Sequence, residues 1–322
     1  MGKAGIVSAG AGGQEGQTFS SVSLMARYAS FVKLPHTLFA LPFAGVGAVL
    51  ASWAHPERVT WLAVLWIAMA FTAARFAAMG FNRIADRVLD AENPRTRSRE
   101  LPSGRLTVRQ AWVSVVMASA LFIFAAAQLN PLCGILSPVA LAWIFFYSYT
   151  KRFTAWAHYV LGLSLGIAPV GAYLGIAGTW PAPWYALPIV AAAVMFWVAG
   201  FDMIYAIQDI DFDRKRGLHS LAARYGTNRA LGFARLLHAI SVVLFLSVRI
   251  FALFPVGALY TTGVILMAVL LLYENRVARS AIGSTIDMRR IDRAFFLVNV
   301  TVSIVLFTLT LLDRVAAHVG VS

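Results

Sequence analysis

Residues 108–127 read VRQAWVSVVMASALFIFAAA, and residues 132–150 read LCGILSPVALAWIFFYSYT. Arg109 is the only charged residue in the two stretches, and each is close to the roughly 20 apolar residues that a membrane-spanning helix needs. Only residues 128–131 lie between them, so the chain crosses an apolar layer and returns at once. This part of the sequence predicts an all-α protein embedded in a lipid bilayer.

Comparable apolar stretches recur along the chain. The 322 residues are 60% hydrophobic and 13% charged, whereas soluble domains carry about 25% charged residues. Residues 1–22 are rich in Gly, Ser and Ala and lack the apolar core of a signal peptide. We interpret them as a disordered cytoplasmic tail, followed by a single transmembrane domain at residues 23–322. Nine spans are expected, at 36–54, 60–80, 108–127, 132–150, 156–176, 185–205, 232–253, 256–273 and 292–312.

The basic residues between the spans indicate the orientation. They fall in the connections 81–107, 151–155, 206–231 and 274–291, whereas the alternate connections carry only Arg58. Because positive residues stay on the cytoplasmic side, the N-terminus and these four connections are predicted to be cytoplasmic and the C-terminus external. The net charge of +13 then reflects topology rather than binding to nucleic acid. The expected location is the cell inner (cytoplasmic) membrane.

A first acidic motif follows the second span. Asn82, Asp86 and Asp90 are four residues apart, so they project from one face of a helix, and Arg75 lies on the same stripe. Oxygen-bearing side chains gathered in this way suit Mg²⁺, which commonly binds one or two carboxylates together with substrate phosphates. The alternative is a solvated helix end with ordinary charges.

Basic residues accompany this motif. Residues 93–105 are rich in Arg, including Arg99, and form either a diphosphate-binding segment or a topology signal. The fourth span ends with Tyr147, Lys151 and Arg152, and the first two are one helical turn apart. A lysine at this position can neutralise a leaving phosphate oxygen; the alternative is an aromatic belt with a topology lysine.

A second acidic motif ends the sixth span. Asp202, Tyr205, Asp209 and Asp213 fall within roughly 80° of one another at 100° per residue, whereas Asp211 points to the opposite side. Asp202 follows an apolar run, and carboxylates inside a membrane are costly and usually functional. A purely structural role for it, in pairing with a neighbouring helix, is the alternative.

Each acidic motif follows the second span of a four-span unit. Spans one to four and five to eight therefore look like two related halves, to which a ninth span is added. Two carboxylate faces at one depth and on one side can face each other across a central cavity. Such a site would hold two Mg²⁺ ions bridged by a diphosphate.

Taken together, these motifs resemble the UbiA superfamily of intramembrane prenyltransferases, and the resemblance covers nearly the whole chain after about residue 25. Nine spans match the fold of that superfamily. The matching motifs are Asn82-x3-Asp86-x3-Asp90 followed by Arg99-Glu100-Leu101-Pro102-Ser103-Gly104, Tyr147-x3-Lys151-Arg152, and Asp202-x2-Tyr205-x3-Asp209-x3-Asp213. The segment around Asn82 looks most like the 4-hydroxybenzoate polyprenyltransferase-like branch, which includes enzymes of the futalosine route to menaquinone.

The resemblance implies a function and a set of roles. It implies transfer of a polyprenyl group from a polyprenyl diphosphate to an aromatic carboxylic acid, either 4-hydroxybenzoate or a hydroxynaphthoate, in ubiquinone or menaquinone biosynthesis. Phe81 departs from the pattern, because many members have a basic or polar residue there. The expected site comprises catalytic Lys151, Asp202 and Tyr147, substrate-binding Asn82, Arg75, Arg152, Tyr205 and Arg99, and Mg²⁺ ligands Asp86, Asp90, Asp209 and Asp213.

A secondary transporter is the competing hypothesis from another class of protein. Asp86 and Asp202 would then be ion-coupling sites. Transporters often interrupt their helices near the middle of the membrane, whereas the acidic groups of this chain cluster at the predicted cytoplasmic ends. The sequence therefore favours the enzyme.

Overall fold

Every regular element in the described part of the chain is a helix, which confirms the all-α prediction. This computed structural model describes residues 24–32, 37–281 and 288–320, so the tail expected at 1–22 lies outside it. The long helices are α2 (Thr37–Ser52), α3 (Trp61–Ala85), α5 (Val108–Leu129), α6 (Pro131–Thr150), α7 (Ala157–Ala177), α8 (Ala186–Ala206), α11 (Thr227–Ile250), α12 (Ala258–Ala281) and α13 (Met288–Val319). The short ones are α1 (Leu24–Phe31), α4 (Arg87–Glu92), α9 (Ile210–Arg216), α10 (Leu221–Tyr225) and two 3₁₀ turns, Pro56–Arg58 and Ile207–Asp209.

Each of the nine predicted spans overlaps one long helix, but the count of nine is approximate. Within the described residues, eight helices are long and apolar enough to cross a membrane. Helix α2 has 16 residues and is therefore about 24 Å long, which is less than the roughly 30 Å of a hydrocarbon core. The predicted boundaries also differ by several residues, as for the span at 232–253, whose helix α11 begins at Thr227.

Local sequence explains where the paired helices α5 and α6 begin. The Thr107 side chain accepts a hydrogen bond from the backbone N–H of Gln110, whose own side chain accepts from the backbone N–H of Thr107. Asn130 accepts from the N–H of Cys133 at the start of α6, where Pro131 needs no partner for its nitrogen. These caps satisfy donors that the apolar membrane would leave unpaired.

Helix α7 joins the two halves of the bundle, because it packs against α2 and α6 of one half and α8 of the other. A Cβ added at Gly47 of α2 would stand 2.0 Å from the carbonyl oxygen of Pro169 in α7. One added at Gly162 of α7 would stand 2.3 Å from the carbonyl oxygen of Met195 in α8. Only glycine permits such approach between helices in a membrane. Helix α13 packs against α12 and α2 and so closes the ring of helices.

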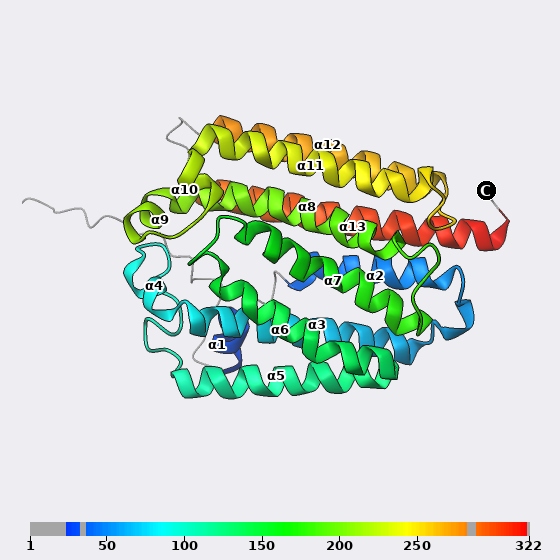
Figure 1. Cartoon of the computed structure of the whole chain (residues 1–322), viewed down its shortest axis with the longest axis horizontal. Coiled ribbons are helices and arrows are strands. Elements are labelled where there is room, and N and C mark those ends of the chain that lie inside the picture. The colour runs from blue at the N-terminus through cyan, green and yellow to red at the C-terminus, as the bar shows by residue number, and fades with distance from the viewer. Residues whose placement is uncertain (1–23, 33–36, 282–287, 321–322) are drawn as a thin grey trace, which may run out of the picture.

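The connections gather at two opposite ends of the bundle (Figure 1). Helices α4, α9 and α10 lie together at one end, where the N–H of His219 donates to the carbonyl of Lys151 at 2.8 Å. At the other end, Arg58 donates to the carbonyl of Ala177, and Arg314 donates to that of Ser52 at 3.3 Å. The three basic connections at 81–107, 151–155 and 206–231 therefore share one end, as the alternation of charge predicted.

Reporter fusions test which end faces the cytoplasm. Fusions at residues 95 and 215 are expected to report a cytoplasmic location, and a fusion at residue 180 an external one, because positive loops are retained inside. The measurement is alkaline phosphatase activity set against green fluorescence for each fusion. An external signal at residue 95 would overturn the predicted orientation.

Candidate active site

The first acidic motif bridges α3 and α4. Helix α3 ends at Ala85, yet the N–H of Asp86 still donates to the carbonyl of Asn82 at 2.9 Å, and that of Asp90 to the carbonyl of Asp86 at 2.8 Å. These bonds keep the helical spacing through the break. The three side chains thus stay on one side, and Asn82 Nδ2 donates to Asp86 Oδ2 at 3.3 Å.

Asp86 is held by cations from the end of α6. Its side chain is buried, and Lys151 Nζ donates to Oδ2 at 2.7 Å. Arg152 Nη2 lies 3.3 Å from Oδ1 and donates to the carbonyl of Ala85 at 2.6 Å. Lys151 follows the last residue of α6, so its side chain reaches across to α3. The structure thus brings together three residues that the sequence assigned to different roles.

Among the described residues, Asp90 has a basic partner on one of its two carboxylate oxygens. Arg99 Nη1 donates to Asp90 Oδ1 at 2.8 Å, and both side chains are largely buried. The other oxygen, Oδ2, is buried and has no hydrogen-bond partner among the described residues. A buried carboxylate oxygen without a partner is costly and is available to a ligand.

The second acidic motif does not follow one continuous helical face. Helix α8 tightens into a 3₁₀ turn at Ile207–Asp209 before α9 begins, so the 100° spacing assumed from the sequence fails here. Asp213 accepts a hydrogen bond from Ser220 at 3.1 Å. Asp211 is exposed, which agrees with its predicted surface position.

Asp209 connects the two halves. Arg95 donates to both carboxylate oxygens of Asp209, from Nε to Oδ1 at 3.0 Å and from Nη2 to Oδ2 at 2.5 Å. Asn93 Nδ2 also donates to Oδ1, at 3.2 Å. Arg95 and Asn93 lie in the connection after α4, so the segments that carry the two motifs touch through this carboxylate. Sequence reasoning placed Arg95 in a basic segment but did not assign it to the site.

Asp202 pairs with a histidine that the sequence analysis did not single out. His158 Nδ1 lies 2.7 Å from Asp202 Oδ2, and the histidine is buried at the start of α7. This contact joins α7 to α8 and is compatible with both roles expected for Asp202, a structural pairing and a part in the reaction. The available signal was a histidine within an apolar span. Tyr147 lies within electrostatic reach of Asp202, Asp86 and Arg75.

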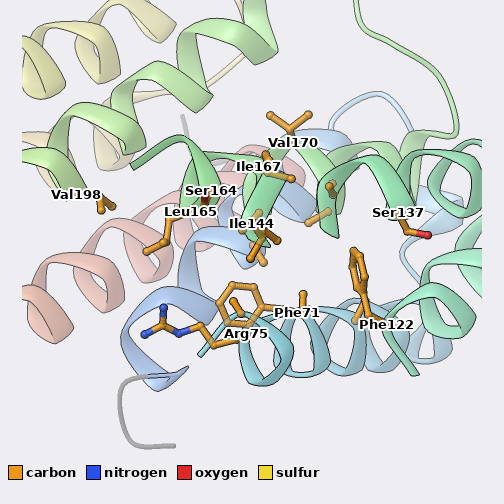
Figure 2. A pocket seen from close by; sticks show the side chains of 18 of the residues that line it. Phe71, Arg75, Phe122, Ser137, Ile144, Ser164, Leu165, Ile167, Val170 and Val198 are labelled. Carbon is orange, nitrogen blue, oxygen red and sulfur yellow. The ribbon is translucent and has the colours of Figure 1, made fainter. Parts of the chain in front are cut away.

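A cavity of about 420 Å³ lies inside the ring of helices, with walls from α2, α3, α5 to α8 and α13. Most of its lining is apolar. Figure 2 shows Phe71 and Arg75 of α3 across the cavity from Ile144 and Leu165 of α6 and α7. The larger polar residues of the lining, apart from its serines and Cys133, are Arg75, Asn82, Tyr147, Tyr205 and Asn299. Four of these five were predicted as site residues; Asn299 was not.

The donor set fits a hard divalent cation, although the carboxylates do not converge on one point. No group of three His, Cys, Asp or Glu side chains in the described residues is close enough to hold a metal ion. Asp86, Asp90 and Asp209 instead pair with Lys151, Arg99 and Arg95. Oxygen-only ligands and the unpartnered Asp90 Oδ2 suit Mg²⁺. Phe81, the residue that departs from the superfamily pattern, stacks its ring on that of Phe145.

Comparison with solved structures supports the fold. A UbiA homolog from Aeropyrum pernix K1 is 34% identical, with a TM-score of 0.76, over 86% of this chain and 98% of that one. A UbiA homolog from Archaeoglobus fulgidus bound to GPP and Mg²⁺ is 20% identical, with a TM-score of 0.63, over 88% of this chain and 99% of that one. At this lower identity the second likeness concerns the fold alone.

Curated relatives are similar over shorter stretches. A polyprenyl transferase from Arthrobotrys oligospora is 34% identical over 197 residues, which are 58% of this chain, and the chain spans about half of that protein, 53%. The 4-hydroxybenzoate octaprenyltransferase of Xanthomonas oryzae pv. oryzae is 32% identical over 244 residues, 73% of this chain and 79% of that protein. The UbiA prenyltransferase family itself matches residues 40–311. With that match over most of its length, the chain belongs to the UbiA prenyltransferase family.

Proposed function

We propose that this protein transfers a polyprenyl group from an allylic polyprenyl diphosphate to a hydroxylated aromatic carboxylic acid, either 4-hydroxybenzoate or a hydroxynaphthoate. The reaction would serve ubiquinone or menaquinone biosynthesis in the inner membrane, with the site facing the cytoplasm. One observation carries the proposal: the mostly apolar cavity is lined by Asn82, which donates to Asp86, and Asp86 pairs with Lys151. An isoprenoid chain suits the apolar part, and a diphosphate suits the charged end.

The charged end can exchange its partners when substrate arrives. Lys151, Arg99 and Arg95 each pair with an aspartate. A diphosphate carries oxygens that these cations bind well, and a bound cation can take over the carboxylates. We expect a substrate that brings a negative diphosphate and a divalent cation to replace these ion pairs.

Asp86, Asp90, Asp209 and Asp213 are the residues that would hold Mg²⁺. The A. fulgidus homolog, which has the same fold, was solved with GPP and Mg²⁺. Bound Mg²⁺ supplies positive charge that stabilises the leaving diphosphate.

The residues of the chain then have defined tasks in the reaction. The bond between C1 of the prenyl group and the diphosphate oxygen breaks, and its electron pair leaves with the diphosphate. Lys151 and Arg99 stabilise the charge that develops on that oxygen. The apolar walls exclude water from the allylic cation. A ring carbon of the acceptor bonds to C1, and the ring loses a proton, for which the Asp202–His158 pair is the proposed acceptor.

A product assay tests the proposal. The full-length protein in lipid nanodiscs would be supplied with Mg²⁺ and farnesyl diphosphate, together with 4-hydroxybenzoate or 6-hydroxy-2-naphthoate. We expect a prenylated acceptor and released diphosphate, detected by mass spectrometry and a coupled diphosphate assay. Absence of any prenylated product with either acceptor class would contradict the proposal. The quinone profile of a deletion strain then identifies the natural acceptor.

A further inference from the structure

A buried polar pair lies against the cavity where α12 packs on α13. Glu274 of α12 is 1% exposed, and Asn299 of α13 is 4% exposed. Asn299 lines the cavity, whereas Glu274 stands behind it. Both lie within helices that are apolar enough to span a membrane. A carboxyl group placed there is costly and calls for a functional explanation.

The hydrogen bonds of Asn299 fix how its amide is turned. Its Nδ2 donates to Glu274 Oε1 at 2.7 Å and to the carbonyl of Phe295 at 3.0 Å. Both amide hydrogens are thereby used. The flipped amide would place an oxygen against these two acceptors, so the network allows one orientation. Asn299 Oδ1 is left buried and without a partner among the described residues.

Two hydroxyl groups of the cavity wall differ from Asn299 in having partners. The hydroxyls of Ser137 and Ser164 donate to the carbonyls of Gly134 and Val160 of their own helices, each at 2.8 Å. Their hydrogens are therefore satisfied within the helix. The amide oxygen of Asn299, in contrast, has no donor among the described residues.

The position of Asn299 suits the aromatic acceptor rather than the diphosphate. Arg75, Asn82 and Tyr147 belong to α3 and α6 of the first half, whereas Asn299 lies on the wall formed with Tyr205 of α8. Aromatic side chains flank it, since Phe296 also lines the cavity and the rings of Tyr205 and Phe295 are 6.2 Å apart. An aromatic ring packs well against such groups. A neutral acceptor atom matches a neutral hydroxyl and would repel a phosphate oxygen.

We propose that Asn299 Oδ1 accepts a hydrogen bond from the ring hydroxyl of the aromatic acceptor, and that Glu274 is a positioning residue that fixes the amide. This inference rests on the proposed function. A hydrogen bond accepted from the hydroxyl shifts electron density into the ring and makes the neighbouring carbon a better nucleophile. Asn299 thereby selects acceptors that carry a ring hydroxyl.

The test compares acceptors that differ in one donor. The binding of 4-hydroxybenzoate is compared with that of 4-methoxybenzoate in a competition assay, and the binding of 6-hydroxy-2-naphthoate with that of its methyl ether. The pair that decides the test is the one whose hydroxy compound is prenylated by the enzyme. We expect the wild type to prefer the hydroxy compound. Asn299→Leu should remove most of this preference and lower kcat/KM for the acceptor about tenfold, the usual scale of one lost hydrogen bond. The KM for farnesyl diphosphate should not change.

Matched variants separate binding from folding. Glu274→Gln keeps an oxygen that accepts from the Asn299 amide and should retain the preference for the hydroxy compound. Glu274→Leu removes that oxygen and should weaken the preference. Thr310→Val is the control on the same helix, because Thr310 is buried and its hydroxyl donates to the carbonyl of Leu306 at 2.6 Å. It should leave the preference and both KM values unchanged.

Two results would overturn the inference. The first is equal binding of the hydroxy and methoxy compounds by the wild type, which needs no variant to fold. The second is an unchanged preference in Asn299→Leu, which would mean that the amide oxygen only binds water. In either case, the proposed function stands as long as the wild-type protein forms prenylated product. If the wild-type protein forms none, the proposed function itself is rejected.

Discussion

Removal of divalent metal from the purified protein is expected to abolish prenyl transfer, and addition of Mg²⁺ is expected to restore it. Asn82 lines the cavity and donates to Asp86, and the buried Asp90 Oδ2 has no partner in the described residues. Without the cation, these negative groups would face the diphosphate and repel it. The measurement is product formation in nanodiscs after EDTA treatment and dialysis, with and without added Mg²⁺ or Mn²⁺.

Protein stability provides the control for this experiment. Asp86, Asp90 and Asp209 pair with Lys151, Arg99 and Arg95, respectively. Because these basic groups can neutralise the carboxylates, the melting temperature is expected to stay nearly constant in EDTA. EDTA saturated beforehand with Mg²⁺ should leave activity intact. Full turnover in metal-free buffer would contradict the assignment of these carboxylates as metal ligands.

Most of the fold could be predicted because a membrane imposes simple rules. Each span must satisfy its own backbone hydrogen bonds, so a long apolar stretch becomes a helix. This rule located the pair α5 and α6 almost to the residue. The same rule predicted the helix α2 at 36–54, but hydropathy shows only that a segment is apolar and not where its helix begins, so whether α2 makes a full span is approximate.

Helical periodicity predicts the arrangement of the first acidic motif but not that of the second. Asn82, Asp86 and Asp90 stay on one side because i to i−4 backbone bonds continue through the end of α3. The tighter turn at Ile207–Asp209 changes the register of the second motif. No propensity rule marks that turn, since the packing of α9 against α10 and the 3₁₀ turn is a tertiary effect.

The remaining site residues are contacts between distant segments, which periodicity does not reveal. Arg95 and Asp209 are separated by 114 positions, and His158 and Asp202 by 44. Asn299 reads in the sequence as one polar residue in an apolar helix. Its place in the cavity wall, with a hydrogen bond to Glu274, depends on how the helices pack and cannot be read from the sequence.

Substitution of Asp86 or Asp209 by Asn is expected to lower kcat at least about 100-fold in each case, the lower scale for losing one electrostatic contact in a transition state. Asn keeps the shape of Asp and can still accept a hydrogen bond from Lys151 or Arg95. Folding should therefore survive while the negative charge is lost. Steady-state kinetics with saturating Mg²⁺, alongside melting temperatures, provide the measurement.

The double variant distinguishes one shared site from two separate ones. If the carboxylates from both halves serve a single diphosphate, the combined loss should be far smaller than the product of the single losses, because residues that act as one unit are not additive. Asp211→Asn is the matched control, since Asp211 is exposed and lies two residues from Asp209. It should keep near-normal activity. Fully multiplicative losses in Asp86→Asn/Asp209→Asn would show that the two motifs do not act on one diphosphate, and the shared central site would have to be abandoned.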